Sequence, residues 1–255
     1  MDIHNSAARG FSAVAASYAR GRPDYPAEAV AWLREDIRLG PEKTVLEVGA
    51  GTGKFIPVLR QTGARVLALE PVEEMRQQLA ATQDDISVMA GTAALIPLPD
   101  GAVDAVVCAQ AFHWFATREA LAEFRRVLAP EGRLGLIWNV RDETTPWVAA
   151  LSAITDPLEG DTPRYRSGAW RAVFPAEGFG AAGERCIPYM HRGSPEDVIL
   201  RRTLSVSFVA AQPEAVRQDI TDKIEQLIRQ TPQLAGQSEI GFPYETRMFT
   251  YQKIG

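Results

Sequence analysis

The stretch LEVGAGTGKF contains three glycines at alternate positions, Gly49, Gly51 and Gly53. An acid, Glu47, precedes them and a lysine, Lys54, follows them. Glycine permits a tight turn and lets a ligand approach the backbone closely. Loops of this kind bind nucleotides between a strand and a helix, so this stretch is a candidate ligand site. The alternative is a tight strand-to-helix turn that binds nothing.

Two common nucleotide loops match this stretch only in part. A P-loop has the pattern G-x-x-x-x-G-K-[ST], but Val48 stands at its first glycine and Phe55 at its hydroxyl position. A dinucleotide loop has the pattern G-x-G-x-x-G, and its third glycine falls on Lys54. Glu70, the acid that follows the next apolar run, would still suit a ribose. A nicotinamide-dependent oxidoreductase therefore stays open as an alternative.

The pattern E-x-G-x-G-x-G, with Glu47 two residues before Gly49, resembles motif I of the class I S-adenosylmethionine-dependent methyltransferases. This cofactor carries a sulfonium and an ammonium but no phosphate, so an acid beside the loop is chemically reasonable. The resemblance implies that Glu47 and the backbone of Gly49, Ala50 and Gly51 bind the amino-acid end. It also implies that Glu70 accepts hydrogen bonds from both ribose hydroxyls.

The adenine end is expected further along the chain. Gly91, Thr92 and Ala93 occupy a segment that often reads G-D-A in the family, so Thr92 replaces an acid that often binds the adenine amine. A hydroxyl accepts a weaker hydrogen bond than a carboxylate, and the neighbouring backbone offers a further contact. Met75 matches a position that often packs on the adenine ring, although it equally suits the core stripe of its own helix. Pro71, which starts that helix, is also expected at the cofactor site.

Two further segments resemble a subgroup of small-molecule methyltransferases related to trans-aconitate methyltransferase, within the type 11-like methyltransferases. They are FSAVAASYARGRPDYP and AQAFHWF. The resemblance implies that Tyr18 and Arg22 close over the cofactor carboxylate, although they equally suit a surface pair. From the second segment it adds to the cofactor site Gln110, Ala111, His113 and Trp114.

His113 is the candidate catalytic residue. An imidazole has a near-neutral pKa and can accept a proton from an acceptor hydroxyl. The alternative is that His113 packs within the loop or positions the cofactor. Trp114 is expected to be a wall of the site. The pattern of His, Cys, Asp and Glu predicts no metal site.

Strands and helices alternate over residues 28 to 140 and must position these side chains. Apolar runs predict strands at 43–50, 64–70, 85–91, 104–110 and 133–140, and apolar spacing predicts helices at 26–39, 54–61, 71–82 and 117–130. Such alternation predicts an α/β fold with a parallel sheet, whose ligands lie at the carboxyl ends of the strands. Beyond residue 140 we expect helices near 147–154, 194–210 and 213–230, and strands near 185–191 and 245–254.

The family resemblance implies a Rossmann-like, seven-stranded, mostly parallel sheet with the last strand antiparallel and helices on both faces. Helical insertions after strands five and six would form a lid. We expect one methyltransferase domain over residues 1–255. Within it, 1–140 hold the N-terminal segment and cofactor core, 141–211 and 212–244 the helices on the substrate side, and 245–255 the final strand.

The overall composition narrows the partners. The 255 residues carry a formal net charge of −5 and no dense Lys/Arg block, which argues against nucleic acid and anionic membranes as partners. No apolar stretch approaches the roughly 20 residues that cross a bilayer. The N-terminus lacks a secretory signal, and the two cysteines form no cluster, so we expect a cytoplasmic protein.

The predicted reaction is direct, in-line methyl transfer to a small-molecule acceptor, with S-adenosylhomocysteine as product. A base is needed only if the acceptor atom is poorly acidic. A non-catalytic cofactor-binding protein of the same fold also stays open. Six arginines in the insertions either attract an acidic substrate or are ordinary solvated and ion-paired residues: Arg141, Arg164, Arg166, Arg171, Arg201 and Arg202.

Overall fold

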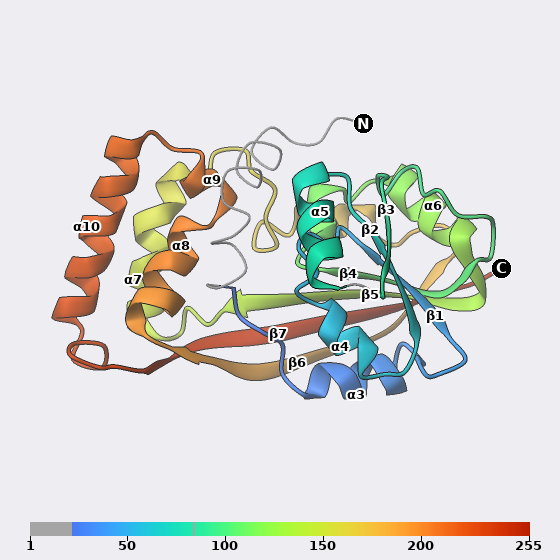
Figure 1. Ribbon diagram of the computed structural model, residues 1–255, viewed down its shortest axis with the longest axis horizontal. Helices are drawn as coiled ribbons and strands as arrows, with labels where there is room; N and C mark the ends of the chain where they lie inside the picture. Colours follow the sequence, from blue (N-terminus) through green and yellow to red (C-terminus); the bar gives the residue numbers. More distant parts are fainter. Residues whose placement is uncertain (1–21, 84) are drawn as a thin grey trace.

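The computed structural model describes residues 22–83 and 85–255, so Tyr18 lies outside the described residues. A seven-stranded sheet has the order β3-β2-β1-β4-β5-β7-β6 (Figure 1). Strands β1 to β5 pair in parallel, and β7 is antiparallel to both of its neighbours, β5 and β6. The predicted mostly parallel sheet with an antiparallel last strand is therefore confirmed. The strands are β1 Thr44–Val48, β2 Arg65–Leu69, β3 Ser87–Met89, β4 Val103–Ala109, β5 Leu128–Arg141, β6 Phe179–Gly193 and β7 Ile240–Lys253.

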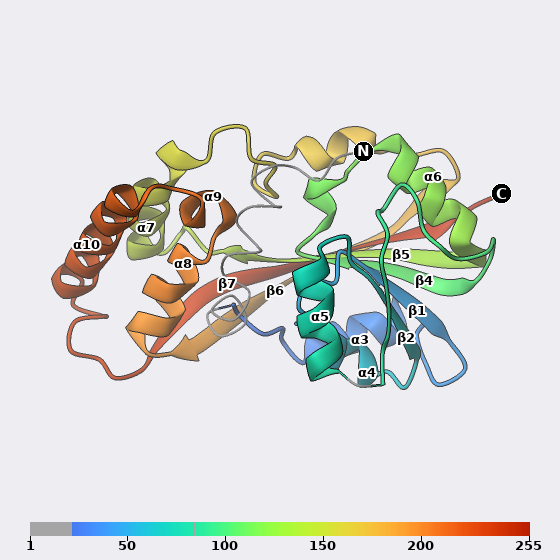
Figure 2. The same ribbon diagram turned by 45° about the horizontal axis from the view of Figure 1, so that its top comes forward.

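Helices cover both faces of the sheet, as predicted (Figure 2). The two faces form separate cores because successive side chains of a strand point to opposite sides. Val45 of β1 packs in the core that includes Trp32 of α3, whereas Leu46 packs in the core that includes Phe124 of α6. The helices of this half are α3 Glu28–Glu35, α4 Ile56–Arg60, α5 Glu73–Thr82 and α6 Arg118–Val127.

The helix after the glycine loop is shorter than the predicted 54–61. It begins at Ile56, which places Pro57 in the first turn. The amide groups of a first turn have no partner within the helix, so a proline costs no hydrogen bond there. The loop therefore keeps a longer stretch of non-helical backbone beside the cavity described below.

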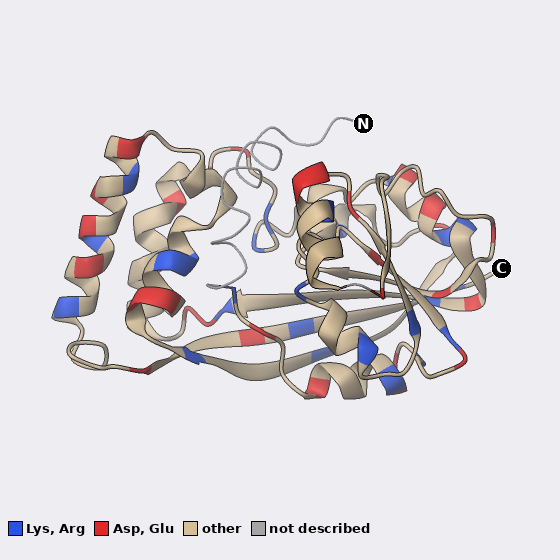
Figure 3. Ribbon diagram, in the orientation of Figure 1, with Lys and Arg blue, Asp and Glu red and all other residues tan. Residues whose placement is uncertain are grey.

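The helical insertions after strands five and six are confirmed and pack together beyond one end of the sheet (Figure 1). A third core joins Val148, Ile199 and Ile224 from these helices to Phe242 of β7. Charged residues of both signs alternate along α10, where Lys223 pairs with Asp219 at 2.6 Å (Figure 3). The helices are α7 Pro146–Thr155, α8 Arg202–Leu204, α9 Ser207–Ala210 and α10 Glu214–Gln230.

Two predicted elements differ from those observed. The single helix expected at 194–210 is a π-helical turn, Glu196–Arg201, followed by the short α8 and α9. Hydroxyl side chains break it, since Ser205 Oγ donates to the Arg202 carbonyl at 2.8 Å. Strand β6 extends beyond the predicted 185–191 at both ends, where pairing with β7 rather than apolar alternation continues it. Strand β7 begins at Ile240, before the predicted 245, and buries Ile240, Phe242 and Tyr244 at alternate positions. Among the described residues, no helix has both the length and the apolar character to span a membrane.

Candidate functional site

A cavity lies at the carboxyl ends of the parallel strands. The order of the sheet reverses between β1 and β4, and parallel sheets of this kind bind ligands at that point. Of the residues predicted for the cofactor site, all that the structure describes line this cavity except His113. They are Arg22, Glu47, Gly49, Ala50, Gly51, Glu70, Pro71, Met75, Gly91, Thr92, Ala93, Gln110, Ala111 and Trp114.

The glycine loop adopts a backbone that other residues rarely take. Gly49 has a φ of 73°, and a Cβ atom built on it would lie 2.8 Å from the Cβ of Ala111. Gly51 has a φ of 58°, and its N–H donates to Glu70 Oε2 at 2.8 Å. The other carboxylate oxygen of Glu70 accepts from the Val72 N–H at 2.9 Å. Glu70 therefore ties the glycine loop to the start of α5.

Two acids with raised pKa values lie at this cavity. Burial, and then the charge of Glu70, raises the pKa of Glu47 to about 8. Its Oε2 atom is buried without a hydrogen-bond partner among the described residues. Burial also raises the pKa of Glu70, although hydrogen bonds from Val72 and Gly51 counteract part of this effect. The wall of the cavity thus offers acidic groups that a cationic ligand would stabilise in their ionised form.

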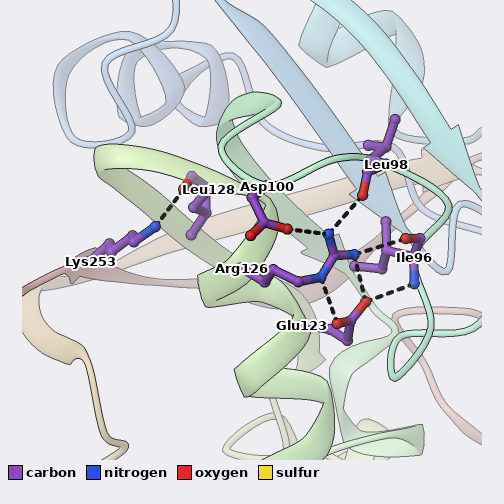
Figure 4. Close-up of polar contacts among 7 residues, drawn as sticks. All are labelled: Ile96, Leu98, Asp100, Glu123, Arg126, Leu128 and Lys253. Atoms are coloured by element: carbon purple, nitrogen blue, oxygen red, sulfur yellow. Dashed lines mark hydrogen bonds and ion pairs between the residues drawn. The ribbon is translucent and has the colours of Figure 1, made fainter.

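The turn that carries Thr92 and Ala93 is held from behind by helix α6. Arg126 donates to the carbonyls of Leu98 at 2.8 Å and Ile96 at 3.0 Å (Figure 4). Glu123 accepts from the Ile96 N–H at 3.0 Å and pairs with Arg126 at 2.8 Å. This network fixes the segment that leads away from the cavity. Local sequence patterns had not indicated the network.

A second cavity adjoins the first and contains His113. The two cavities share part of their walls, namely Arg22, Gln110, Trp114 and Arg202. Between them, Gln110 adopts a φ of 57°, which is uncommon for a residue other than glycine. Its side-chain amide donates to the carbonyl of Asn139 at 3.2 Å. Strained backbone of this kind is frequent at functional sites.

The hydrogen bonding of His113 defines its protonation. Trp138 Nε1 donates to His113 Nδ1 at 3.1 Å, so the ring proton of the neutral imidazole resides on Nε2. Burial, followed by the charges of Arg164 and Arg22, lowers the pKa of His113 to about 3. His113 is therefore neutral at pH 7, and its only lone pair is already engaged by Trp138.

Arg202 and Phe115 were not among the predicted site residues, although both line the first cavity. Phe115 closes the H-W-F segment, and its ring lies 3.2 Å from the Cβ position of Gly49. Its place directly after His113 and Trp114 is the sequence feature that could have identified Phe115 as a site residue. Arg202 comes from the helical segment 196–204, far along the chain from the strand-end residues of the first cavity, and no local pattern marked it among the neighbouring arginines.

Comparisons with known proteins agree with this geometry. A family model described as a methyltransferase domain matches residues 46–136. An uncharacterized methyltransferase-like protein of Schizosaccharomyces pombe is 34% identical over 246 residues, which cover 95% of each chain. An uncharacterized methyltransferase of Mycobacterium tuberculosis is 37% identical over 236 residues, which cover 92% of each chain.

Solved structures show the same fold. A candidate type II methyltransferase from Anaeromyxobacter dehalogenans superposes with a TM-score of 0.64 at 25% identity, covering 91% of this chain and 96% of its own. The YcgJ protein of Bacillus subtilis superposes with a TM-score of 0.57 at 19% identity, covering 90% of this chain and 100% of its own. The chain therefore belongs to the class I S-adenosylmethionine-dependent methyltransferases, and S-adenosylmethionine is its methyl donor.

Proposed function

We propose that this methyltransferase transfers the methyl group to a small-molecule acceptor, and that the acceptor binds in the second cavity. The observation that supports this most directly is the shared wall between the two cavities. A donor in the first cavity and an acceptor in the second would meet beside Gln110 and Trp114. We also propose that the helical insertions at 141–211 and 212–244 serve as the lid on the acceptor side.

The first cavity has the chemistry that the donor requires. Glu47, with its unpartnered Oε2, would bind the ammonium group, and the backbone of Gly49 to Gly51 would approach the amino-acid end. Each oxygen of Glu70 accepts one backbone N–H and keeps a second lone pair, which is available to a ribose hydroxyl. Met75 and the segment Gly91–Ala93 would border the adenine. Arg22 would bind the carboxylate.

The catalytic task of the protein is alignment and exclusion of water. When bound, S-adenosylmethionine supplies an electrophilic methyl carbon, whose bond electrons return to sulfur as the acceptor lone pair forms the new bond. The wall of Gln110 and Trp114 would hold the acceptor atom in line with that carbon. The sheet keeps this wall rigid, because Gln110 N–H donates to the Ile137 carbonyl of β5 at 2.9 Å.

We assign His113 the role of a neutral hydrogen-bond donor to the acceptor through Nε2–H. Its Nδ1 lone pair is engaged by Trp138, so proton abstraction would require that bond to break. Replacing Trp138 by Phe removes the N–H that holds this tautomer. We expect the variant to raise the KM for the acceptor while the affinity for S-adenosylhomocysteine stays unchanged. An unchanged KM would contradict the assignment.

The decisive experiment combines binding and transfer. Titration calorimetry with S-adenosylhomocysteine and with NAD should show binding of the first and none of the second. Incubation with radiolabelled S-adenosylmethionine and a broad metabolite panel should then label a small molecule. Label recovered only in protein or nucleic acid would refute a small-molecule acceptor, and no transfer across the panel would favour a non-catalytic binding protein.

Glu70 provides the matched variant. Replacing Glu70 by Ala should weaken binding of S-adenosylhomocysteine by roughly 10- to 100-fold, since two charge-assisted hydrogen bonds are lost. Glu74, which is exposed in the first turn of the following helix α5, serves as the control, and its replacement by Ala should change the affinity less than about twofold. Equal affinities of the two variants would refute the ribose assignment.

A further inference from the structure

The six arginines named from the sequence, of which Arg141 is the last residue of β5, fall into two groups in the structure. Arg166 pairs with Asp156 at 2.8 Å and Glu159 at 2.5 Å, and Arg201 pairs with Glu196 at 2.8 Å. Arg171 lies over the ring of Trp170, with its guanidinium carbon 4.5 Å from the ring centroid. These three have ordinary partners. The other three, Arg141, Arg164 and Arg202, line the second cavity, as does the paired Arg166.

Arg141 and Arg202 are partly buried and have no carboxylate within salt-bridge distance among the described residues. The hydrogen bonds of Arg141 are long and go to neutral hydroxyls, 3.4 Å to Ser152 Oγ and 3.3 Å to Thr203 Oγ1, and its guanidinium carbon lies 5.9 Å from the centroid of the Phe242 ring. Two nitrogens of Arg202, Nε and Nη1, are buried without a hydrogen-bond partner among the described residues. Neither arginine forms a salt bridge within the described ranges 22–83 and 85–255.

Arg164 is only partly compensated. It lies 3.5 Å from Glu159, which also serves Arg166 at 2.5 Å, and its Nη1 makes no hydrogen bond with the described residues. Its guanidinium carbon is 4.8 Å from the centroid of the Phe208 ring. One carboxylate therefore serves two guanidinium groups on this side of the cavity.

The three guanidinium groups repel one another. Burial, and then the charge of Arg202, lowers the pKa of Arg141 to about 10, although Tyr244 and Glu143 act in the opposite direction. Burial also lowers the pKa of Arg164, and Arg202 contributes in the same direction. The acids that line the cavity are Glu143 and Asp156, and Asp156 is engaged by Arg166. Buried, mutually repelling cations are costly unless an anion joins them, and guanidinium groups match carboxylate and phosphate in geometry.

We propose that Arg141, Arg164 and Arg202 form a cradle for an oxyanion of the methyl acceptor, which makes the acceptor an acidic small molecule. The oxyanion is a carboxylate or a phosphate group. Arg202 also lines the donor cavity, so the cradle holds the acceptor next to the methyl group. This inference rests on the proposed function, because it names the class of acceptor for the second cavity.

Titration calorimetry on the full chain saturated with S-adenosylhomocysteine tests the cradle. The probes are succinate, inorganic phosphate and the neutral analogue succinamide, compared at equal ionic strength. We expect succinate or phosphate to bind and succinamide not to bind, and the tighter of the two anions identifies the group. Equal binding of succinamide and succinate, or no binding of either anion up to about 10 mM, would overturn the proposal.

Two neighbouring arginines supply the variant and its control. Arg202→Gln should weaken anion binding about 10- to 100-fold, because a charge-assisted contact is lost. Arg201→Gln removes a charge that pairs with Glu196 and Asp197 instead, and should change anion affinity less than about twofold. Equal effects of the two variants would show a general charge effect and overturn the cradle.

A stability measurement separates a binding role from a structural one. Arg141→Met keeps the volume of the side chain and removes a poorly compensated buried cation, so the Tm without anion should stay equal or rise. The increase in Tm that succinate or phosphate gives the wild type should disappear. A fall in Tm of several degrees, with the anion effect retained, would show a structural arginine. Binding of S-adenosylhomocysteine is measured separately for the wild type and for each variant. If the wild type does not bind S-adenosylhomocysteine, the result contradicts the proposed function and not the anion cradle.

Discussion

The buried carboxyl of Glu47 should make the stability of the cofactor-free protein fall as the pH rises. Glu47 is 1% exposed, and burial with the neighbouring Glu70 raises its pKa from 4.5 to about 8. The native state then keeps a proton that the unfolded chain has already lost. The stabilisation is complete below about pH 4.5 and is lost progressively as the pH rises toward and through about 8.

The magnitude follows from this interval. Each pH unit over which the native state alone keeps the proton costs about 1.4 kcal/mol of unfolding free energy, so the full interval amounts to roughly 4–5 kcal/mol. Glu47→Gln replaces the titrating carboxyl by a neutral group of the same shape. Its unfolding free energy should therefore change little between pH 5 and pH 8. Above about pH 8, the variant should be more stable than the wild type by several kcal/mol.

Urea unfolding of both proteins at half-unit pH steps measures this difference. Glu42→Gln is the control, since Glu42 is exposed in the turn before the same strand and its variant should follow the wild type. Parallel pH curves for the wild type and Glu47→Gln would refute the reasoning. Cofactor binding supplies a second check, because a cationic ligand should ionise Glu47. Calorimetry near pH 7 in buffers of different ionisation enthalpy should then detect proton release by the wild type and none by the variant.

Two further substitutions test the scaffold of the site. Gly49→Ala should weaken S-adenosylhomocysteine binding at least about tenfold in calorimetry, because a φ of 73° and a contact of 2.8 Å with Ala111 both oppose a Cβ. Gly40→Ala has open space around it and should bind as the wild type does. Arg126→Met should lower the unfolding free energy by roughly 2–3 kcal/mol in urea, since two charge-assisted bonds to carbonyls are lost. An equal loss in Arg118→Met, which is exposed on the same helix, would contradict this.

Much of the sheet and of the donor cavity followed from local patterns. A buried strand needs a short apolar run and an amphipathic helix needs a spaced one, so both can be seen in adjacent residues. The glycines at 49 and 51 and the acids Glu47 and Glu70 belong to the same signal, because they lie directly at strand ends. Parallel strands bring those ends to one edge, which is why the predicted residues line one cavity.

The acceptor side depended on contacts between distant segments. No local pattern distinguishes Arg202 from Arg201, yet one lines both cavities and the other pairs with Glu196 on the outside. Neighbouring positions of a helix point in different directions, so the packing of this helix decides which guanidinium group faces the cavities. The length of β6 likewise depends on its partner β7, because its own residues are mostly exposed and lack apolar alternation.

The protonation of His113 shows the same division. By itself, the sequence determined that a histidine follows the fourth strand at its carboxyl end, where a ligand is expected. Only the tertiary structure decided its tautomer, since Trp138 belongs to the next strand and reaches it across 25 positions of chain. Periodicity and loop motifs are properties of neighbouring residues. Burial, charge and hydrogen bonding at a site depend on segments that folding brings together, and these set what each side chain can do.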